Sequence, residues 1–441
     1  MAELNFTIKR LGKCNVPSPI TLSKHYGDSL ANYVSDEEHI LFDVDARPKD
    51  PRKTYRANEL LEKAGPREMI FFNPGHVHAG IVTCGGLCPG LNDVIRAMVR
   101  CLWHRYGVRR ITGIRNGYQG LLPEFNIPTL PLDPLIVDDI HTKGGTILGS
   151  ARGYGDRISE LSDAIERMNI NMLFTIGGDG TQRGALEISR ELEKRKLKIA
   201  VVGVPKTIDN DLSFIQRSFG FETAVSKAVE AVASAHVEAS DSINGVGMVK
   251  VMGRESGFIA AYTTLAINDV NFTLIPEIPF ELHGENGLLF HLKERLEDRS
   301  HAVILVAEGA GQDILKASGK TDRSGNKILG DIGLHLKQEI EEYFENEEME
   351  VHIKYIDPSY MIRATPAHPT DSIYCARLGS HAVHAAMAGR TETLMSMINN
   401  TFVHLPIGTA VSRRNTVDPE GSLWRDVLEV TRQPMRMMDK S

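Results

Sequence analysis

Short apolar segments rich in Val and Ile, each followed by glycine or a polar cluster, alternate with longer segments of helical periodicity from His78 onward. This alternation predicts an α/β fold in which parallel-sheet, Rossmann-like domains are connected by crossover helices. Ligands bind where the carboxyl ends of parallel strands meet the following loops. We therefore expect an active site in the cleft between two domains. The expected strands are residues 79–83, 111–114, 172–176, 200–204, 246–251, 302–307 and 352–356.

The domain organisation follows from length and local composition. With 441 residues the chain exceeds the usual size of one domain. Residues 1–75 are rich in Pro, Asp and Arg without sustained periodicity, and we expect an N-terminal extension or arm there. Two α/β domains are expected at 76–240 and 241–400, followed by a C-terminal extension at 401–441.

Charge, cysteine content and apolar segments indicate which partners and which location to expect for this protein. The formal net charge is −7, so no nucleic-acid or membrane partner is expected. The five cysteines are an odd number without a C-x-x-C pair, which argues against a disulfide framework, and Cys84 and Cys88 lack further zinc ligands nearby. No apolar stretch reaches the ~18 residues of a membrane span, and the N-terminus lacks a secretory apolar core. These features predict a cytoplasmic protein that binds a small molecule.

The first candidate loop is Ile-Gly-Gly-Asp-Gly-Thr at 176–181, which follows an apolar strand and precedes a helix expected at 184–194. Its glycines allow close approach of the backbone to a ligand, and a helix N-terminus favours phosphate. Asp179 would repel phosphate unless a metal stood between them, which indicates Mg²⁺. The alternative is a strand-to-helix turn with an Asp cap.

A second loop, Gly-Val-Pro-Lys-Thr-Ile-Asp-Asn-Asp at 203–211, is the strongest single feature. Asp209 and Asp211, beside Lys206 and Thr207, could supply a base, a neighbouring charge and a phosphate contact. The alternative is a solvated acidic loop. The glycine-rich loop at 83–92 is weaker evidence, because it lacks the full G-x-G-x-x-G spacing.

Cationic side chains follow other strands. Arg152 and Arg254 each stand beside glycine in a loop at a strand end, where fixed cations suit phosphoryl transfer. Tyr360 and Arg363 follow the strand at 352–356, and an arginine there can bind a substrate phosphate through two hydrogen bonds. Glu308 could accept a hydrogen bond from a sugar hydroxyl. For Arg152 and Arg254 the alternative is a surface salt bridge, and for Glu308 it is a helix cap or a surface carboxylate.

One motif is a decoy. Ser-Gly-Lys-Thr at 318–321 imitates the end of a P-loop, but Ile314 occupies the position of the required first glycine. An exposed turn is expected there.

Four motifs in this order, Gly-Gly-Asp-Gly-Thr, Pro-Lys-Thr-Ile-Asp-Asn-Asp, Met-Gly-Arg and Tyr-Met-Ile-Arg, resemble the 6-phosphofructokinase family. The resemblance covers roughly residues 79–389. The long N-terminal segment and the Lys-Thr-Ile-Asp variant are most similar to the atypical ATP-dependent branch related to pyrophosphate-dependent enzymes. It implies ATP-dependent phosphorylation of fructose 6-phosphate at its 1-hydroxyl in glycolysis, with the nucleotide bound by 76–240 and the sugar phosphate by 241–400.

The resemblance also implies roles for individual residues. Asp209 would be the general base, Thr207 would orient the reacting phosphoryl group, and Asp179 would hold Mg²⁺. Asp211 would lie near Asp179 and its Mg²⁺, and Arg254 would also stabilise the charge of the transition state. The nucleotide-binding residues would be Gly86, Arg152, Gly153, Gly178, Asp179, Gly180 and Thr181. The substrate-binding residues would be Thr207, Asp209, Met252, Gly253, Arg254, Glu308, Tyr360 and Arg363.

Two positions bear on the phosphoryl donor. Pyrophosphate-dependent relatives carry an aspartate at position 180, which would crowd and repel the α-phosphate of a nucleotide, so Gly180 favours ATP. Lys206 is typical of the pyrophosphate users, yet a lysine can serve either donor. A third departure concerns assembly: Gly245 stands where short bacterial relatives carry an interface arginine. A homo-oligomer, dimer or tetramer, is still expected.

Three competing functions stay open. A pyrophosphate-dependent phosphotransferase would use the same acceptor. An NAD or lipid kinase would share Gly-Gly-Asp-Gly-Thr but leave the acidic loop and residues 360–363 unexplained. A non-catalytic nucleotide sensor would need only the glycine loops, and the presence of Asp209 and Arg254 argues against it.

Overall fold

The computed structural model describes residues 5–42, 57–315 and 328–439. The chain divides into two compact units, each formed by three segments. Unit 1 comprises residues 1–207, 212–220 and 365–414, and unit 2 comprises 208–211, 221–364 and 415–441. The Ser-Gly-Lys-Thr decoy at 318–321 lies outside the described residues.

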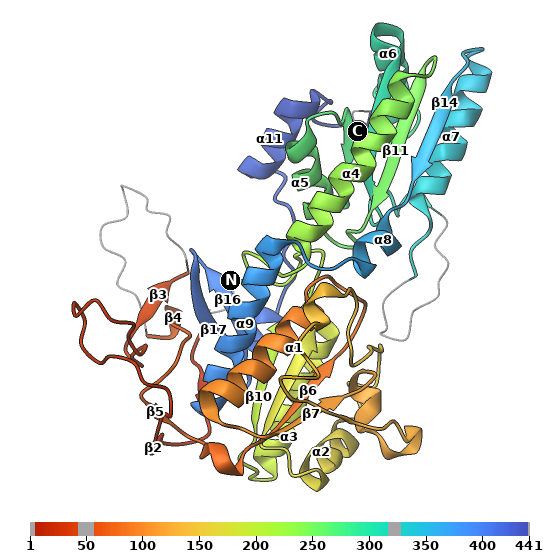
Figure 1. Ribbon diagram of the computed structural model, residues 1–441. Coiled ribbons are helices and arrows are strands. Elements are labelled where there is room, and N and C mark those ends of the chain that lie inside the picture. The colour runs from red at the N-terminus through yellow and green to blue at the C-terminus, as the bar shows by residue number, and fades with distance from the viewer. Residues whose placement is uncertain (1–4, 43–56, 316–327, 440–441) are drawn as a thin grey trace. The chain divides into compact units, whose positions relative to one another are not determined.

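Unit 1 is built on a seven-stranded sheet of order β17-β16-β10-β9-β6-β7-β8 (Figure 1). Five strands from β16 to β7 are parallel, and β17 and β8 pair antiparallel at the two edges. The whole of β6, β9 and β10 is buried, as expected of central strands in a parallel sheet covered on both faces. The strands are β6 (His78–Thr83), β7 (Arg110–Ile114), β8 (Leu130–Pro131), β9 (Met172–Gly177), β10 (Ala200–Pro205), β16 (Thr393–Ile398) and β17 (Thr401–Pro406).

Among the helices of unit 1, α1 contacts α9 and α2 contacts α3. Helix α1 and helix α9 run alongside one another (Figure 1). A π-helical segment, η3, continues α1. The bounds are α1 (Leu91–Arg100), η3 (Cys101–Tyr106), α2 (Ile158–Arg167), α3 (Asp179–Lys194), α9 (Pro369–Met387) and α10 (Ile407–Ala410), with short 3-10 turns η4 (Gly117–Leu121), η5 (Pro123–Phe125) and η6 (Ile140–Thr142).

Unit 2 contains a four-stranded parallel sheet of order β12-β13-β11-β14. Successive residues of β11 face opposite sides: Val246 and Met248 pack in one apolar cluster, and Val249 and Val251 pack in another. The strands are β11 (Gly245–Val251), β12 (Phe272–Leu274), β13 (His301–Ala307) and β14 (His352–Ile356). The helices are α4 (Phe221–Ser240), α5 (Phe258–Ile267), α6 (Leu288–Arg299), α7 (Ile332–Asn346), α8 (Ser359–Ala364) and α11 (Ser422–Thr431).

The described part of the N-terminal segment packs on unit 1. β1 (Lys9–Arg10) pairs with β15 (Arg390–Thr391), and β3 (His39–Leu41) pairs with β4 (Leu60–Glu62), which contacts β17. β2 (Val16–Pro17) pairs with β5 (Met69–Ile70), and the 3-10 turns η1 (Ala57–Glu59) and η2 (Pro74–His76) complete the segment. It is therefore an integral layer of this unit.

The seven expected strands are confirmed, but two features differ from expectation. Helix α3 begins at Asp179 and not at 184, because the glycines at 180 and 184 are accommodated inside the helix. The unit boundaries also differ from the expected 76–240 and 241–400: α4 belongs to unit 2, while α9 and residues up to 414 belong to unit 1. Within the described residues, no helix combines the length and apolarity that a bilayer crossing requires.

Candidate functional site

In unit 1, three loops meet at the carboxyl edge of the central strands. Thr83 pairs with Ile176, and Gly177 pairs with Pro205, so β6, β9 and β10 end side by side. Beyond the strands, the Cys84 N–H donates to the Ile176 carbonyl at 2.9 Å and the Lys206 N–H donates to the Gly177 carbonyl at 3.0 Å. The glycine loops predicted from the sequence are thus brought together.

The loop after β9 leads directly into α3, a helix of 16 residues. Gly178 occupies the N-cap with an extended backbone and no side-chain cap, so the first N–H groups of the helix and its dipole are available to an anion. A Cβ atom on Gly177 would collide with the Thr181 side chain. The Tyr118 hydroxyl donates to the Thr181 carbonyl at 2.8 Å and fixes the first turn.

Gly180 lies in this first turn beside open space. A Cβ atom added to it would meet no other atom within 4 Å. A larger side chain here would therefore extend beyond the helix surface without disturbing the packing of the protein. The space beside Gly180 in the first turn of the helix is therefore open.

Two cations border the loop after β6. A Cβ atom on Gly86 would lie 3.6 Å from Arg152 Nη2, and one on Gly85 would lie 3.4 Å from Lys206 Nζ. The Gly85 N–H donates to the Ala151 carbonyl at 3.0 Å, which joins the two loops. Gly153 has a φ of 90°, a left-handed conformation that favours glycine. The predicted nucleotide-side residues thus lie around one set of strand ends.

Asp179 is the first residue of α3, and its Oδ2 atom accepts a hydrogen bond from Arg183 Nε at 3.0 Å. Among the described residues no group of three or more His, Cys, Asp or Glu side chains is arranged to hold a metal ion. A single carboxylate such as that of Asp179 does not suffice to hold Mg²⁺ by itself. It fits the way in which Mg²⁺ binds with nucleotides, where one or two carboxylates and the substrate phosphates together hold the ion.

Unit 2 contains the second set of predicted residues, centred on Asp209. The Asp209 side chain is partly buried, and its Oδ1 atom is fully buried without a hydrogen-bond partner in the described part of the chain. Burial and the nearby carboxylates of Asp211 and Glu308 raise the pKa of Asp209 to about 7, against the opposing effects of the Arg363 charge and the Arg254 backbone N–H. The carboxyl group can therefore exchange a proton near neutral pH.

Arg254 stands in the loop after β11, next to the end of β13. The Glu308 N–H donates to the Val251 carbonyl at 2.9 Å, and the Gly309 N–H donates to the Gly253 carbonyl at 3.0 Å. Gly253 has a φ of 134°, and a Cβ atom there would lie 2.5 Å from the Ser256 carbonyl. Arg254 Nε is buried without a hydrogen-bond partner among the described residues, and Glu255 Oε1 lies 3.9 Å from it, too far for a hydrogen bond. An anionic ligand would satisfy this donor.

The remaining predicted residues lie at the end of β14 and after β10. Arg363 Nε lies 3.2 Å from the Met252 sulfur, which places both beside Asp209 in unit 2. Tyr360, on the same short helix α8, is 83% exposed. Thr207 is buried and belongs to unit 1, where its carbonyl accepts a hydrogen bond from the Ser218 hydroxyl.

Several residues that organise these loops were not predicted. Gln182 Nε2 donates to the carbonyls of Thr175, Gly177 and Val204 at 3.0–3.2 Å and so clamps β9 to β10. Ser256 Oγ donates to the Asp209 carbonyl at 3.0 Å, and the Asn415 N–H donates to the Asp211 carbonyl at 2.8 Å. Ser256 lies two residues after the Met-Gly-Arg motif, whereas no local pattern marks Asn415.

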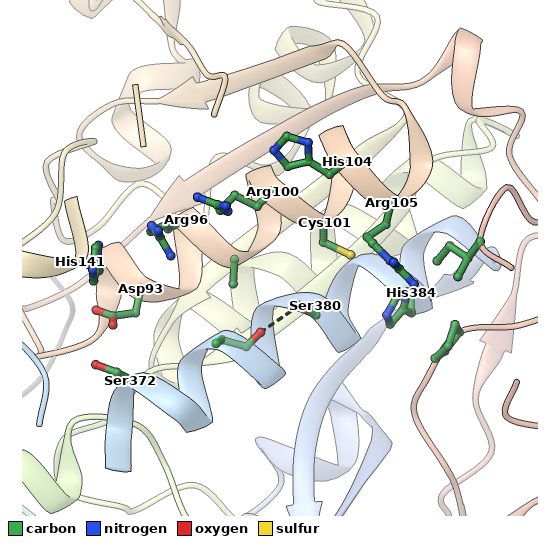
Figure 2. A pocket seen from close by; sticks show the side chains of 14 residues that line it. Asp93, Arg96, Arg100, Cys101, His104, Arg105, His141, Ser372, Ser380 and His384 are labelled. Atoms are coloured by element: carbon green, nitrogen blue, oxygen red, sulfur yellow. Dashed lines mark hydrogen bonds between the residues drawn. The ribbon is translucent and has the colours of Figure 1, made fainter. Parts of the chain in front are cut away.

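A cavity of about 710 Å³ lies elsewhere in unit 1, among α1, η3 and α9. Its wall includes the basic side chains of Arg96, Arg100 and Arg105 and the carboxylate of Asp93 (Figure 2). None of the residues predicted for the site lines it.

Two parallel-sheet units, one with an open helix N-terminus at its strand ends and one with a carboxyl group among arginines, are typical of a phosphotransferase. The family model described as Phosphofructokinase matches residues 78–386. The chain belongs to this family.

Curated relatives extend the similarity along the chain. An ATP-dependent 6-phosphofructokinase of Borreliella burgdorferi is 57% identical over 442 residues, covering 99% of this chain and 98% of the relative. An ATP-dependent 6-phosphofructokinase of Amycolatopsis methanolica is 46% identical over 435 residues, covering 97% and 94%. These matches confirm the family that the four motifs indicated.

The fold is shared with solved structures. A pyrophosphate-dependent phosphofructokinase from Marinobacter aquaeolei superimposes with a TM-score of 0.65 at 21% identity, covering 83% of this chain and 92% of that one. At this identity the likeness concerns the fold alone, and it confirms the α/β architecture.

Proposed function

We propose that this protein is an ATP-dependent 6-phosphofructokinase that transfers the γ-phosphoryl group of ATP to the 1-hydroxyl of fructose 6-phosphate. The products are fructose 1,6-bisphosphate and ADP, as in glycolysis. The observation that carries the proposal is the Asp209 carboxyl group, whose pKa of about 7 suits a base that takes a proton from a hydroxyl at neutral pH. The 57% identity to an ATP-dependent relative supports the donor.

On the donor side, we assign the phosphates of ATP to the N-terminus of α3 and the loops around it. Gly178, Gly180 and Thr181 would offer backbone N–H groups, with Gly86 and Gly153 giving the backbone close access. Arg152 and Lys206 would contribute positive charge. Asp179 would hold Mg²⁺ together with the phosphates, and the ion would neutralise negative charge on the phosphate oxygens.

On the acceptor side, Arg363 and Tyr360 would bind the 6-phosphate, Glu308 would accept from a sugar hydroxyl, and Met252 and Gly253 would shape the sugar site. Arg254 would stabilise charge on the migrating phosphoryl group, in keeping with its buried Nε, which has no hydrogen-bond partner among the described residues. Thr207 would orient that group.

The reaction then needs one proton transfer and one displacement. Asp209 accepts the proton of the 1-hydroxyl as the oxygen attacks the γ-phosphorus. A bond forms between this oxygen and the phosphorus, the bond from the phosphorus to the β–γ bridging oxygen breaks, and ADP leaves. Protein side chains form no covalent bond, so positioning and charge stabilisation carry the catalysis.

The alternative donor is pyrophosphate. A lysine at position 206 is typical of the pyrophosphate-dependent enzymes, while the open space at Gly180 leaves room for the α-phosphate of a nucleotide. We favour ATP because a lysine can serve either donor, whereas an aspartate at position 180 would exclude one.

A paired assay tests the proposal. Purified protein with Mg²⁺ and fructose 6-phosphate is given either ATP or pyrophosphate, and formation of the 1,6-bisphosphate is measured. We expect turnover with ATP and little with pyrophosphate. The reverse preference would make the protein a pyrophosphate-dependent enzyme, and tight nucleotide binding without any transfer would favour a sensor. A cytoplasmic location and a dimeric or tetrameric assembly stay predictions.

A further inference from the structure

Glu277, which follows β12 in unit 2, binds two distant segments of the chain with one oxygen. Its Oε1 atom accepts the Gly257 N–H at 3.0 Å and the Val417 N–H at 2.7 Å. Its Oε2 atom is buried and has no hydrogen-bond partner in the described residues. Gly257 immediately precedes α5, and Val417 lies 140 residues further along the chain than Glu277.

Both segments contact the loop that carries Asp209. On one side, Ser256 Oγ donates to the Asp209 carbonyl at 3.0 Å. On the other side, Asn415 donates from its N–H to the Asp211 carbonyl at 2.8 Å and from Nδ2 to the Asn210 carbonyl at 3.2 Å. The carbonyls of residues 209, 210 and 211 are thus all hydrogen-bonded by Ser256 or Asn415. Ser256 is next to Gly257, and Asn415 is two residues before Val417, so both lie close to an N–H group that Glu277 binds. The segment before Gly257 also supplies the Arg254 backbone N–H, which opposes the rise in the pKa of Asp209.

We propose that Glu277 is a positioning residue for catalysis, because it fixes the two segments that hold the backbone of residues 209–211. This proposal rests on the proposed role of Asp209 as the base. Glu277 itself need not touch a substrate. A base displaced by a fraction of an ångström from its hydroxyl loses rate, because proton transfer and attack depend on close alignment. Loss of Glu277 should therefore lower kcat more than it weakens binding of ATP.

Three substitutions of Glu277 separate its hydrogen bonds from its charge. Glu277→Gln keeps an Oε1 acceptor of the same reach, so kcat should stay within about threefold of the wild type. Glu277→Asp is one methylene shorter, and Glu277→Ala has no acceptor. For both we expect kcat to fall about tenfold or more while the KM for ATP hardly changes. Burial raises the pKa of Glu277 against the effect of its two N–H partners, which agrees with a role that does not need the charge.

A matched control tests whether the effect is only structural. Gln433 also fastens the C-terminal segment to the region of β12, since its Oε1 accepts the Thr273 N–H at 2.6 Å and its Nε2 lies 3.3 Å from the Thr273 carbonyl. Gln433→Ala should lower Tm but preserve kcat at 25 °C. If Glu277→Ala and Glu277→Asp keep the wild-type kcat, or lose no more of it than Gln433→Ala, the proposal is overturned. Equal loss in the Gln and Ala variants would overturn it as well.

A double-mutant cycle covers the case in which Glu277→Ala does not fold. Ser256→Ala removes one hydrogen bond to the Asp209 carbonyl and is combined with Glu277→Asp. If both act through the same loop, their effects on kcat are non-additive, whereas additive effects contradict the proposal. Asp209→Asn is assayed separately. If this variant retains turnover, the assignment of Asp209 as the base is refuted. If it is inactive while the Glu277 variants have normal kcat, only the role of Glu277 is refuted.

Discussion

At the scale of single residues, the raised pKa of Asp209 has a kinetic consequence. A base with a pKa of about 7 is half protonated at neutral pH, and only its deprotonated form accepts the substrate proton. We therefore expect kcat/KM for fructose 6-phosphate, which reports the pKa of the free enzyme, to rise with pH through about 7 to a plateau. Asp209→Asn cannot accept the proton, so kcat should fall by ~10²–10⁴ while KM for fructose 6-phosphate changes little.

Steady-state kinetics across pH 5.5–9 would check both expectations. Circular dichroism of the Asn variant serves as the control for folding. A variant with near-normal turnover, or a wild-type profile that is flat through neutral pH, would show that another group takes the proton.

Gly180 permits a prediction about the donor. An aspartate placed there would project into open space and bring a negative charge to the nucleotide side. Repulsion of ~1–4 kcal/mol between charges a few ångströms apart should lower kcat/KM for ATP by about tenfold or more in Gly180→Asp. Gly180→Asn has nearly the same size without the charge and separates crowding from repulsion. If both variants use ATP as the wild type does, the role of this position in donor choice is wrong.

At the scale of elements, the start of α3 depends on which glycine is replaced. In Gly177→Ala the new methyl would collide with the Thr181 side chain, so the first turn of the helix must shift at a cost of ~1–3 kcal/mol, and ATP should bind more weakly. In Gly180→Ala the methyl meets no atom within 4 Å, and alanine in a helix should leave the free energy of unfolding unchanged or raise it by up to ~1 kcal/mol.

Urea unfolding and calorimetric titration of ATP with Mg²⁺ would compare these two variants. A Gly177→Ala protein as stable as the wild type would mean that the loop adapts without shifting the helix.

The helices and strands that could be predicted from the sequence are those that a pattern of neighbouring residues indicates. The buried strands of both sheets follow from their apolar runs, and the residues at their ends could be named because parallel strands end at one edge. The start of α3 was misjudged because Gly180 and Gly184 suggest a loop when taken alone, whereas Gly178 provides the N-cap. Asn415 donates to a carbonyl 205 residues away, and one of the two partners of Glu277 lies 140 residues away, so no local pattern could identify these two residues.

At the scale of the whole molecule, the N-terminal segment is joined to the sheet of unit 1 by a buried charge cluster. Glu62 Oε1 accepts from Arg67 Nη2 at 3.0 Å, from Arg390 Nη2 at 2.8 Å, and lies 3.1 Å from His404 Nδ1. The side chains are 1–6% exposed. The composition of residues 1–75 suggests an arm because two of these partners, Arg390 and His404, lie more than 300 positions away from Glu62 in the sequence.

Protonation of this cluster should destabilise the protein in acid. Burial and the neighbouring charges of Arg67 and Arg390 lower the pKa of His404 to about 4, against the opposing effect of Glu62. His404 is therefore neutral at pH 7. Burial would raise the pKa of Glu62, but the hydrogen bond with His404 and the charges of Arg390 and Arg67 lower it. Since the folded-state pKa of His404 is below its ordinary value of 6.5, the unfolded chain binds the proton first as the pH falls. The stability contributed by neutral His404 is present above pH 6.5 and is lost between pH 6.5 and about 4.

The variant His404→Phe isolates this contribution. The pKa of His404 is 6.5 in the unfolded chain and about 4 in the folded protein. This difference corresponds to roughly 3 kcal/mol of folding stability that the wild type loses between pH 6.5 and 4 through protonation of this side chain. Phenylalanine cannot be protonated, so the variant should lose about that much less between pH 6.5 and 4, although it starts from a lower stability because the contact with Glu62 is gone.

Urea unfolding at half-unit pH intervals measures the stability of both proteins against pH. The control is Glu68→Gln, which breaks only the exposed pair with Lys24 and should leave the wild-type curve unchanged. Parallel curves for His404→Phe and the wild type would show that His404 is not the group whose protonation loosens the N-terminal segment.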